Sequence, residues 1–317
     1  MKKKTRAALA AFVIVAAAVM CAFAPAPEIK WVDVAVSEWA LRACLKADKE
    51  LYESSGGFNF SDAVAYLALK NGNRFKKSTD EKNLKKLVAD IKDGKTMDEL
   101  FGESKYAAYL RASYGAVLRP IVGDYEEEGT GKKGHGLRCC FPLAAGHWYN
   151  HYDDFGSSRS FGFKRKHLGH DIMGSVGTPI VATEGGTVTE CGWNRYGGWR
   201  VGIRSDDNLR YWYYAHLRKD RPFAAGMQVG KRVTPGEVIG YLGVTGYSDR
   251  ENVNLKSCSP HLHFGLQLIF SPEQEKGAKE IWVDLYALTR FLSSYRVRAP
   301  KGEDGEARAE GRRLWSL

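Results

Sequence analysis

The sequence predicts an α+β protein in which a small all-α region precedes a mainly antiparallel β domain. Apolar residues recur at helical spacing up to about residue 122, whereas short strand-like runs without helical periodicity fill the segment between about 167 and 270. The 317 residues suffice for about two domains plus tails. We expect a signal or membrane anchor at 1–27, a helical region at 28–122, a Gly-rich linker at 123–136, a β domain at 137–298 and a disordered tail at 299–317.

The N-terminus has the pattern of an export signal. Its first six residues, Met1-Lys-Lys-Lys-Thr-Arg6, are basic, and an uncharged, mostly apolar run of 18 residues, Ala7–Ala24, follows. This run reaches the lower limit of what can span a bilayer. We predict an uncleaved anchor that leaves the rest of the chain outside the cytoplasm. Secretion after cleavage, at Ala22-Phe23-Ala24 or Ala24-Pro25-Ala26, is the alternative.

Four helices are expected in the region that follows. Ser61 or Asp62 would cap the second helix, and Ser78-Thr79-Asp80-Glu81 has the spacing of a capping box for the third, which would end near Gly94. These helices contain no catalytic cluster, so binding of a protein partner is a hypothesis and a spacer is the alternative. The expected ranges are Val36–Tyr52, Ala63–Lys70, a segment from about 81 to 93, and Tyr106–Arg119.

Two further segments frame the β domain. Gly123–Gly136 contains five glycines and runs of like charge, a composition typical of a flexible linker. Ile281–Tyr295 is expected to form a short amphipathic helix that closes the domain, and the charged segment Ala299–Leu317 is expected to be disordered.

Two separated clusters in the β domain carry the side chains of a metal site. In His261-Leu262-His263 the two histidines would point to one face of a strand, whereas Gly169 indicates a turn within His167-Leu-Gly-His-Asp171. Catalytic zinc typically takes three protein ligands and leaves a fourth position open. His167, Asp171 and one histidine of the pair would supply those ligands. His170 is a weaker candidate, because adjacent residues in an extended segment rarely reach one ion.

The order of the motifs resembles the lysostaphin-type (LytM-like) zinc metalloendopeptidases, a family of bacterial cell-wall hydrolases. The resemblance covers roughly residues 140–290. It is carried by His167-x-Gly-x-Asp171, Gly177-Thr178-Pro179-Ile180-Val181-Ala182, Gly185-Gly186-Thr187-Val188, Tyr214-Ala215-His216-Leu217, Val238-Ile239-Gly240-Tyr241-Leu242-Gly243, Thr245-Gly246 and Pro260-His261-Leu262-His263-Phe264.

This resemblance implies a zinc ion bound by His167, Asp171 and His263, with His216 and His261 as the catalytic histidines. It implies hydrolysis of peptide bonds in peptidoglycan. A non-hydrolytic scaffold or activator on the same fold is the alternative, although such relatives would lose ligands and this chain keeps all five positions. An amidase that cuts between sugar and peptide is a second alternative.

The chain departs from the family pattern at two places. The segment Tyr247–Ser259 is longer than the connection typical of the family, and Gly265 stands where an acidic residue is frequent. Because the longer loop would stand near the catalytic end of the groove, it is expected to affect which substrate is selected.

The net charge indicates the kind of binding partner, and the cysteine count limits the disulfides that the chain can form. A net charge of +10 favours an anionic partner. Nucleic acid is not expected, because no nucleotide or nucleic-acid motif is present. Anionic wall polymers or membrane lipids explain the charge equally well. Outside the N-terminal segment five cysteines remain, so they cannot all pair within one chain; whether Cys191 and Cys258 form a disulfide is left open.

Overall fold

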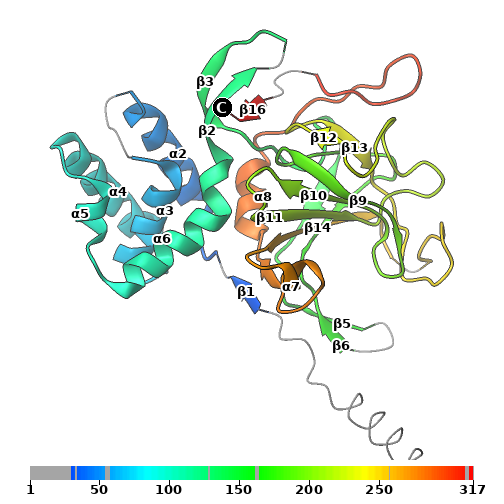
Figure 1. Cartoon of the computed structure of the whole chain (residues 1–317), viewed down its shortest axis with the longest axis horizontal. Coiled ribbons are helices and arrows are strands. Elements are labelled where there is room, and N and C mark those ends of the chain that lie inside the picture. Colours follow the sequence, from blue (N-terminus) through cyan, green and yellow to red (C-terminus); the bar gives the residue numbers. More distant parts are fainter. Residues whose placement is uncertain are drawn as a thin grey trace, which may run out of the picture.

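The computed structural model describes residues 30–32, 34–53, 58–127, 129–160, 164–256, 258–310 and 314–316. Helices form one lobe and strands form the other, as Figure 1 shows, which confirms the predicted α+β class. The anchor predicted at 1–27 lies outside the described residues. Within the described ranges, no helix combines the length and the apolar character needed to cross a bilayer.

Five helices build the first lobe, and side chains cap most of them. Ser37, Asn59 and Ser104 each accept a hydrogen bond from a backbone N–H of the first helical turn. The cap predicted at Ser61 or Asp62 was therefore wrong, since Asn59 takes that position. The helices are α2 (Glu38–Leu51), α3 (Phe60–Lys70), α4 (Lys77–Lys92), α5 (Met97–Phe101) and α6 (Lys105–Leu118).

The capping box predicted at the start of α4 was also wrong. This helix begins at Lys77, and its N-cap, Lys76, makes no side-chain capping bond. The reciprocal pair lies instead at the start of α5, where Thr96 and Glu99 each bond the other's backbone N–H. Gly94 does follow the end of α4 with a positive φ of 91°, as a helix C-terminus requires.

The segment predicted as a flexible linker forms a β-hairpin, so that prediction was wrong. Strands β2 (Val122–Glu127) and β3 (Lys133–Leu137) pair antiparallel, and β16 (Leu314–Ser316) pairs with β2. His135 of β3 contacts Asp48 of α2 and Asp124 of β2, each at 2.7 Å. The contact with Asp48 links the hairpin to the helical lobe. Glycine content and charge runs, on which the linker prediction relied, carry no information about such contacts.

The predicted disordered tail is ordered over residues 299–310. Ala299 and Ala307 are buried in a small apolar cluster with Tyr241, and the backbones of Arg298 and Glu310 pair in an isolated β-bridge. The helix predicted at Ile281–Tyr295 is correct only in its second half. Its first residues form β15 (Ile281–Val283), and α8 (Tyr286–Leu292) follows.

A nine-stranded sheet dominates the second lobe, and its pairs are antiparallel except for β1 with β15. The main order is β1-β15-β14-β11-β10-β9-β12, while β7 pairs with both β14 and β4. The strands of this sheet are β1 (Lys30–Val32), β4 (Tyr149–His151), β7 (His170–Gly174), β9 (Gly186–Asn194), β10 (Gly198–Ser205), β11 (Arg210–Ala215), β12 (Arg232–Val233), β14 (His261–Leu268) and β15.

Smaller elements complete this lobe. Strands β8 (Pro179–Val181) and β13 (Val238–Tyr241) pair with each other, as do β5 (Ser158–Ser160) and β6 (Lys164–Lys166). A 3₁₀ turn (Arg119–Ile121) follows α6, and α7 (Pro272–Glu275) follows β14.

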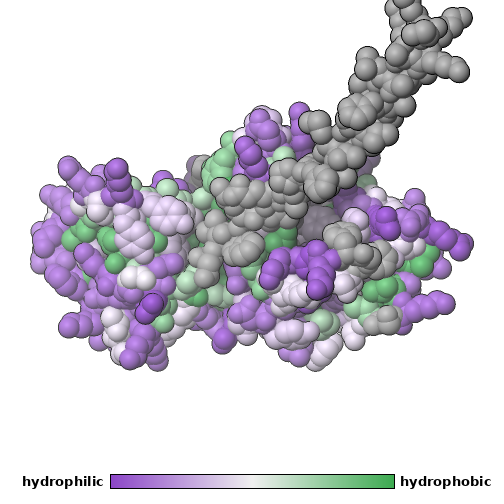
Figure 2. All heavy atoms as spheres, turned by 90° about the horizontal axis from the view of Figure 1, so that it is seen from below, coloured by the Kyte–Doolittle hydropathy of each residue, from purple (hydrophilic) through white to green (hydrophobic). Residues whose placement is uncertain are grey.

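Successive side chains of the central strands point to opposite faces of the sheet. One face is packed in the apolar core, and we call the other, which carries the candidate site, the open face. On β14, Leu262, Phe264 and Leu266 are fully buried, and Trp212 of β11 stacks on Phe264 with ring centroids 5.3 Å apart. Buried residues of the helices, of α8 and of this sheet face belong to one continuous apolar cluster. On the face seen in Figure 2, hydrophilic side chains cover much of both lobes.

Among the described cysteines none forms a disulfide. The Sγ of Cys191 lies 3.7 Å from the carbonyl oxygen of Met227, and that of Cys258 lies 3.6 Å from Nδ1 of His261. Cys44, Cys139 and Cys140 are buried, and burial raises the pKa of all three thiols, that of Cys140 to about 12.

A buried ion pair stands where the two lobes meet. Arg210 is 1% exposed and forms a forked contact with Glu184 at 2.9 and 3.0 Å. The same guanidinium donates to the carbonyl of Ala116 in α6, and Trp212 donates its indole N–H to Glu184. The pair therefore joins the core of the sheet to the end of a helix.

Replacing Arg210 by methionine is expected to lower the free energy of unfolding by about 3–5 kcal/mol, because Glu184 would stay buried without its partner. Urea unfolding followed by circular dichroism measures this loss. The control is Arg232→Met, which breaks a half-exposed pair with Asp206 and should cost less than about 1 kcal/mol. Equal losses in the two variants would contradict the assignment.

Candidate metal centre

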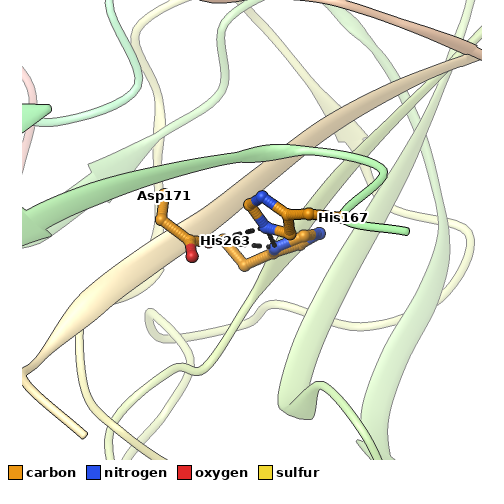
Figure 3. A group of neighbouring side chains, drawn as sticks. All are labelled: His167, Asp171 and His263. Atoms are coloured by element: carbon orange, nitrogen blue, oxygen red, sulfur yellow. Dashed lines mark hydrogen bonds and ion pairs between the residues drawn. The ribbon is translucent and has the colours of Figure 1, made fainter. Parts of the chain in front are cut away.

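Three side chains from two distant segments converge at the open face of the sheet. His167 Nε2 lies 2.9 Å from His263 Nδ1, and Oδ1 of Asp171 lies 3.1 Å from each of these nitrogens. Figure 3 shows the three groups directed at one another. A tetrahedral zinc ion with bonds of about 2.0–2.1 Å separates its ligands by about 3.3 Å. The triangle needs to open by only a few tenths of an ångström, so the donor set fits zinc in both chemistry and size.

Strand pairing creates this convergence. Asp171 of β7 lies directly opposite His263 of β14, and both side chains project to the open face. His167 stands just before β7, where the chain turns, and is 4% exposed. The three ligand candidates thus depend on the register between two strands about 90 residues apart in the chain.

Gly169 allows the two segments to approach each other. A Cβ at this position would lie 2.5 Å from Cε1 and Nε2 of His263, far inside van der Waals contact. The chain does bend at this glycine, as the sequence predicted, although φ here is not in the left-handed region. The reason for glycine is the close passage of the chain beside the His263 ring.

Asp154 contacts two of the three candidate ligands, His167 and Asp171. Its Oδ2 lies 3.2 Å from Nδ1 of His167, and the backbone N–H of Asp171 donates to Oδ1 at 3.4 Å. Asp154 is 3% exposed and also pairs with Arg159 at 2.9 Å. A carboxylate on the outer nitrogen of a ligating histidine fixes the ring and its tautomer. One side chain therefore holds two of the three candidate ligands.

His216 and His261 complete the open face. Nδ1 of His216 donates to the carbonyl of Thr245 at 2.7 Å, and Nδ1 of His261 donates to that of Ser259 at 2.8 Å. Each ring, when neutral, consequently presents Nε2 as a proton acceptor, and when protonated it offers Nε2–H as a donor. The two ring centroids are 4.8 Å apart, and His261 Nε2 lies 3.8 Å from Asp171 Oδ1. All five residues predicted for the site are therefore neighbours.

The backbone of His216 is held in an unusual conformation. Its φ of 62° lies in the left-handed region, which costs energy for a residue with a side chain. Two backbone hydrogen bonds maintain it: the His216 N–H donates to Gly197, and the His216 carbonyl accepts from Gly243. This geometry directs the ring toward the metal group.

The electrostatics of the centre concentrate positive charge around one carboxylate. Burial favours the neutral form of Asp171, but hydrogen bonds from His167 and His263 outweigh it and hold its pKa well below the usual range. Burial likewise disfavours protonated His167, yet the bonds to Asp154 and Asp171 raise its pKa to about 9.

The pKa values of the two remaining histidines, His216 and His261, shift in opposite directions. Burial and the neighbouring His261 and His263 lower the pKa of His216 to about 3. For His261, burial also disfavours the charged form, but the contact with Cys258 and the charge of Asp171 raise its pKa. His216 therefore stays neutral, whereas His261 retains a proton more readily.

Other histidines lie outside the group. His170 points to the opposite face of β7, where its Nε2 is 2.7 Å from Nδ1 of His151. His147 and His135 lie elsewhere in the fold. No sequence motif indicated Asp154, because its contacts with the ligand candidates His167 and Asp171 span 13 and 17 residues of the chain.

A groove of about 1090 Å³ extends from the metal group along the open face. Its floor is made of residues that alternate with the core residues on the central strands. The floor includes Glu190 and Asn194 of β9, Arg200 and Arg204 of β10, Tyr211 and Tyr213 of β11, and His263 and Gln267 of β14.

Comparisons with known proteins agree with this geometry. Residues 165–275 match the model of peptidase family M23. Over 161 residues the chain is 38% identical to the L-Ala–D-Glu endopeptidase of Bacillus subtilis. This alignment covers 51% of this chain and 46% of that protein. Over 99 residues the chain is 38% identical to the glycyl-glycine endopeptidase ALE-1 of Staphylococcus capitis. This alignment covers 31% of this chain and 24% of that protein.

The chain thus spans less than half the length of these curated relatives. Among solved structures, lytM from Ruminococcus gnavus is similar in fold, with a TM-score of 0.53 and 24% identity over 84% of this chain and 91% of that one. The matches confirm the family resemblance indicated by the order of the motifs.

Asp154→Asn is expected to weaken zinc binding by about 10- to 100-fold, because the amide removes the charge that orients His167. Competition with a chromogenic chelator measures the dissociation constant. Asp153→Asn is the matched control, since Asp153 is the exposed neighbour and touches none of the ligands. Unchanged zinc affinity in Asp154→Asn would rule out this supporting role.

Proposed function

We propose, from the peptidase family M23 domain that this chain contains, that the protein is a zinc-dependent endopeptidase that hydrolyses peptide bonds of bacterial peptidoglycan. The observation that carries the proposal is the triangle of His167, Asp171 and His263 with two further histidines presenting Nε2 beside it. A scaffold without activity would have no need for those two rings. The endopeptidase named in Bacillus subtilis supports the same reaction class.

His167, Asp171 and His263 would hold the zinc ion through Nε2, Oδ1 and Nδ1. When bound, zinc lowers the pKa of a water molecule and polarises the scissile carbonyl. Asp154 keeps His167 in the tautomer that offers Nε2, and the register of β7 with β14 keeps Asp171 opposite His263.

His216 suits the role of proton acceptor. Its Nδ1–H donates to the carbonyl of Thr245, and no hydrogen bond joins its Nε2 to another described residue. Burial and the neighbouring histidines keep the ring neutral. His261 retains a proton more readily and stands closer to Asp171, so its Nε2–H would donate to the oxygen that becomes negative or to the leaving nitrogen. Both rings are 5% exposed, which limits competition from bulk water.

The site of action would be outside the cytoplasm, where peptidoglycan lies. Retention through residues 1–27 as an anchor, or secretion after cleavage, remains a proposal that rests on the basic start and the apolar run. We also propose that residues 28–122 serve a protein partner. The basic net charge suits an anionic wall surface.

Purified full chain is expected to release peptide fragments from isolated peptidoglycan, and a chelator should abolish the release. Mass spectrometry of the fragments measures both the activity and the bond that is cut. Products separated between sugar and peptide would identify an amidase instead. Zinc-loaded protein that releases nothing would contradict the endopeptidase proposal and favour the non-hydrolytic scaffold or activator.

The roles within the site predict different phenotypes. Asp171→Ala should lose zinc and activity together, because a charged ligand is missing. His216→Ala should keep zinc but lower turnover by about 10²- to 10⁴-fold, the range of general acid–base catalysis. Metal content and the rate of fragment release measure these effects, with His147→Ala as a control outside the metal group. Unchanged turnover in His216→Ala would remove this residue from the mechanism.

A further inference from the structure

The β5–β6 hairpin places two arginines side by side at the edge of the metal centre. Arg159 of β5 and Arg165 of β6 are directly opposite each other in the antiparallel pair, so their side chains leave the same face. Like charges in this arrangement repel each other and destabilise the hairpin unless each finds an anion. The two arginines differ in whether they do.

Arg159 has its anions within the protein. Its Nη2 lies 2.9 Å from Asp154 and 3.4 Å from Oδ2 of Asp171. These contacts neutralise the guanidinium and fasten the hairpin to the metal ligands. Arg159 is therefore part of the centre already described.

Arg165 has no such partner. Its Nη2 donates to the hydroxyl of Tyr247, and its guanidinium carbon lies 5.0 Å from the Tyr247 ring and 5.8 Å from the Tyr196 ring. Its Nε is buried and makes no hydrogen bond, and no carboxylate of the described residues forms an ion pair with it. The aromatic rings hold the group in place without neutralising it.

The position of Arg165 relates it to the chemistry. Arg165 and His263 line the same groove, and the Tyr247 ring stacks on the His216 ring with centroids 5.6 Å apart. One aromatic ring thus separates the guanidinium from a catalytic histidine. An extended peptide covers such a distance in about two or three residues.

The other arginines of the groove are already neutralised. Arg200 pairs with Glu190 at 3.0 Å, and Arg204 pairs with Glu275 at 2.8 Å. Lys164 and Lys166, on either side of Arg165, are exposed and lack its aromatic support. Within the described part of the groove, Arg165 is the arginine that is both held rigidly and left with unused donors.

We propose that Arg165 binds a carboxylate of the substrate peptide within a few residues of the bond that is cut, so that the enzyme selects acidic peptides over neutral ones such as oligoglycine. The inference rests on the proposed peptidase function and specifies its substrate class. A planar guanidinium recognises a carboxylate through paired hydrogen bonds, and the Nη donors that Tyr247 does not take can supply such bonds. Tyr247, from the loop that is longer than usual in the family, positions it.

The test uses a synthetic peptide that spans the bond identified from the wall fragments, together with analogues in which each carboxylate is converted to a carboxamide. The wild-type enzyme should prefer one free carboxylate by about 10- to 100-fold in kcat/KM, mainly through KM, as expected for a charge-assisted bond. Arg165→Gln should cleave both peptides at nearly equal kcat/KM. Its zinc content verifies that the metal centre has formed.

Lys164→Gln is the matched control, because it removes one charge from the same strand at an exposed position. It should keep the preference for the carboxylate. Equal cleavage of both peptides by the wild type, a cut bond with no carboxylate nearby, or a preference that survives in Arg165→Gln would overturn the assignment while leaving the peptidase intact. Failure of the wild type to cleave any peptide would instead refute the proposed function itself.

Discussion

The antiparallel register of β14 is the constraint on which the rest of the centre depends. It sets Asp171 opposite His263 on one side and Ala215, the neighbour of His216, opposite His263 on the other. Because side chains alternate along a strand, a slip of one residue would turn the histidines into the core. Fully buried Leu262 and Phe264 prevent that slip, since it would expose them to water. Apolar packing on one face therefore fixes the arrangement of the candidate metal ligands on the other.

The positively charged groups of the candidate metal centre must also be balanced by carboxylates. Four groups that can carry positive charge, His167, His263, His261 and Arg159, lie within 4 Å of Asp171. Asp154 provides a second carboxylate and spreads that charge over two acids. Adding a divalent cation would raise the positive charge further, so the buried Asp154 carboxylate would help to stabilise the bound ion.

The sequence predicted which residues would lie together in the candidate metal centre, because two of the signals are local. Alternation puts His261 and His263 on one face, and the order of motifs supplies the rest. Asp154 and Arg165 could not be found in this way, since their roles depend on contacts across loops. The hairpin at residues 122–137 was missed because glycines and charge runs resemble a linker, whereas pairing and the His135 contacts with Asp48 and Asp124 hold it in place. The turn predicted at Gly169 is present as a bend, and the close approach of the His263 ring is a second reason for glycine.

The helical lobe is continuous with the core of the sheet, and this limits what it can do. Arg42 of α2 donates to the carbonyl of Phe291 in α8, and Phe60 of α3 lies 6.3 Å from the Phe291 ring. No described residue of the helices α2 to α6 lines the groove. The lobe packs against the core side of the sheet, while substrate would bind on the opposite side. Any partner that the lobe binds would therefore act through the shared core or by positioning the whole enzyme. Under our proposal, β6, the loop of Tyr247 and the floor of the groove select the substrate.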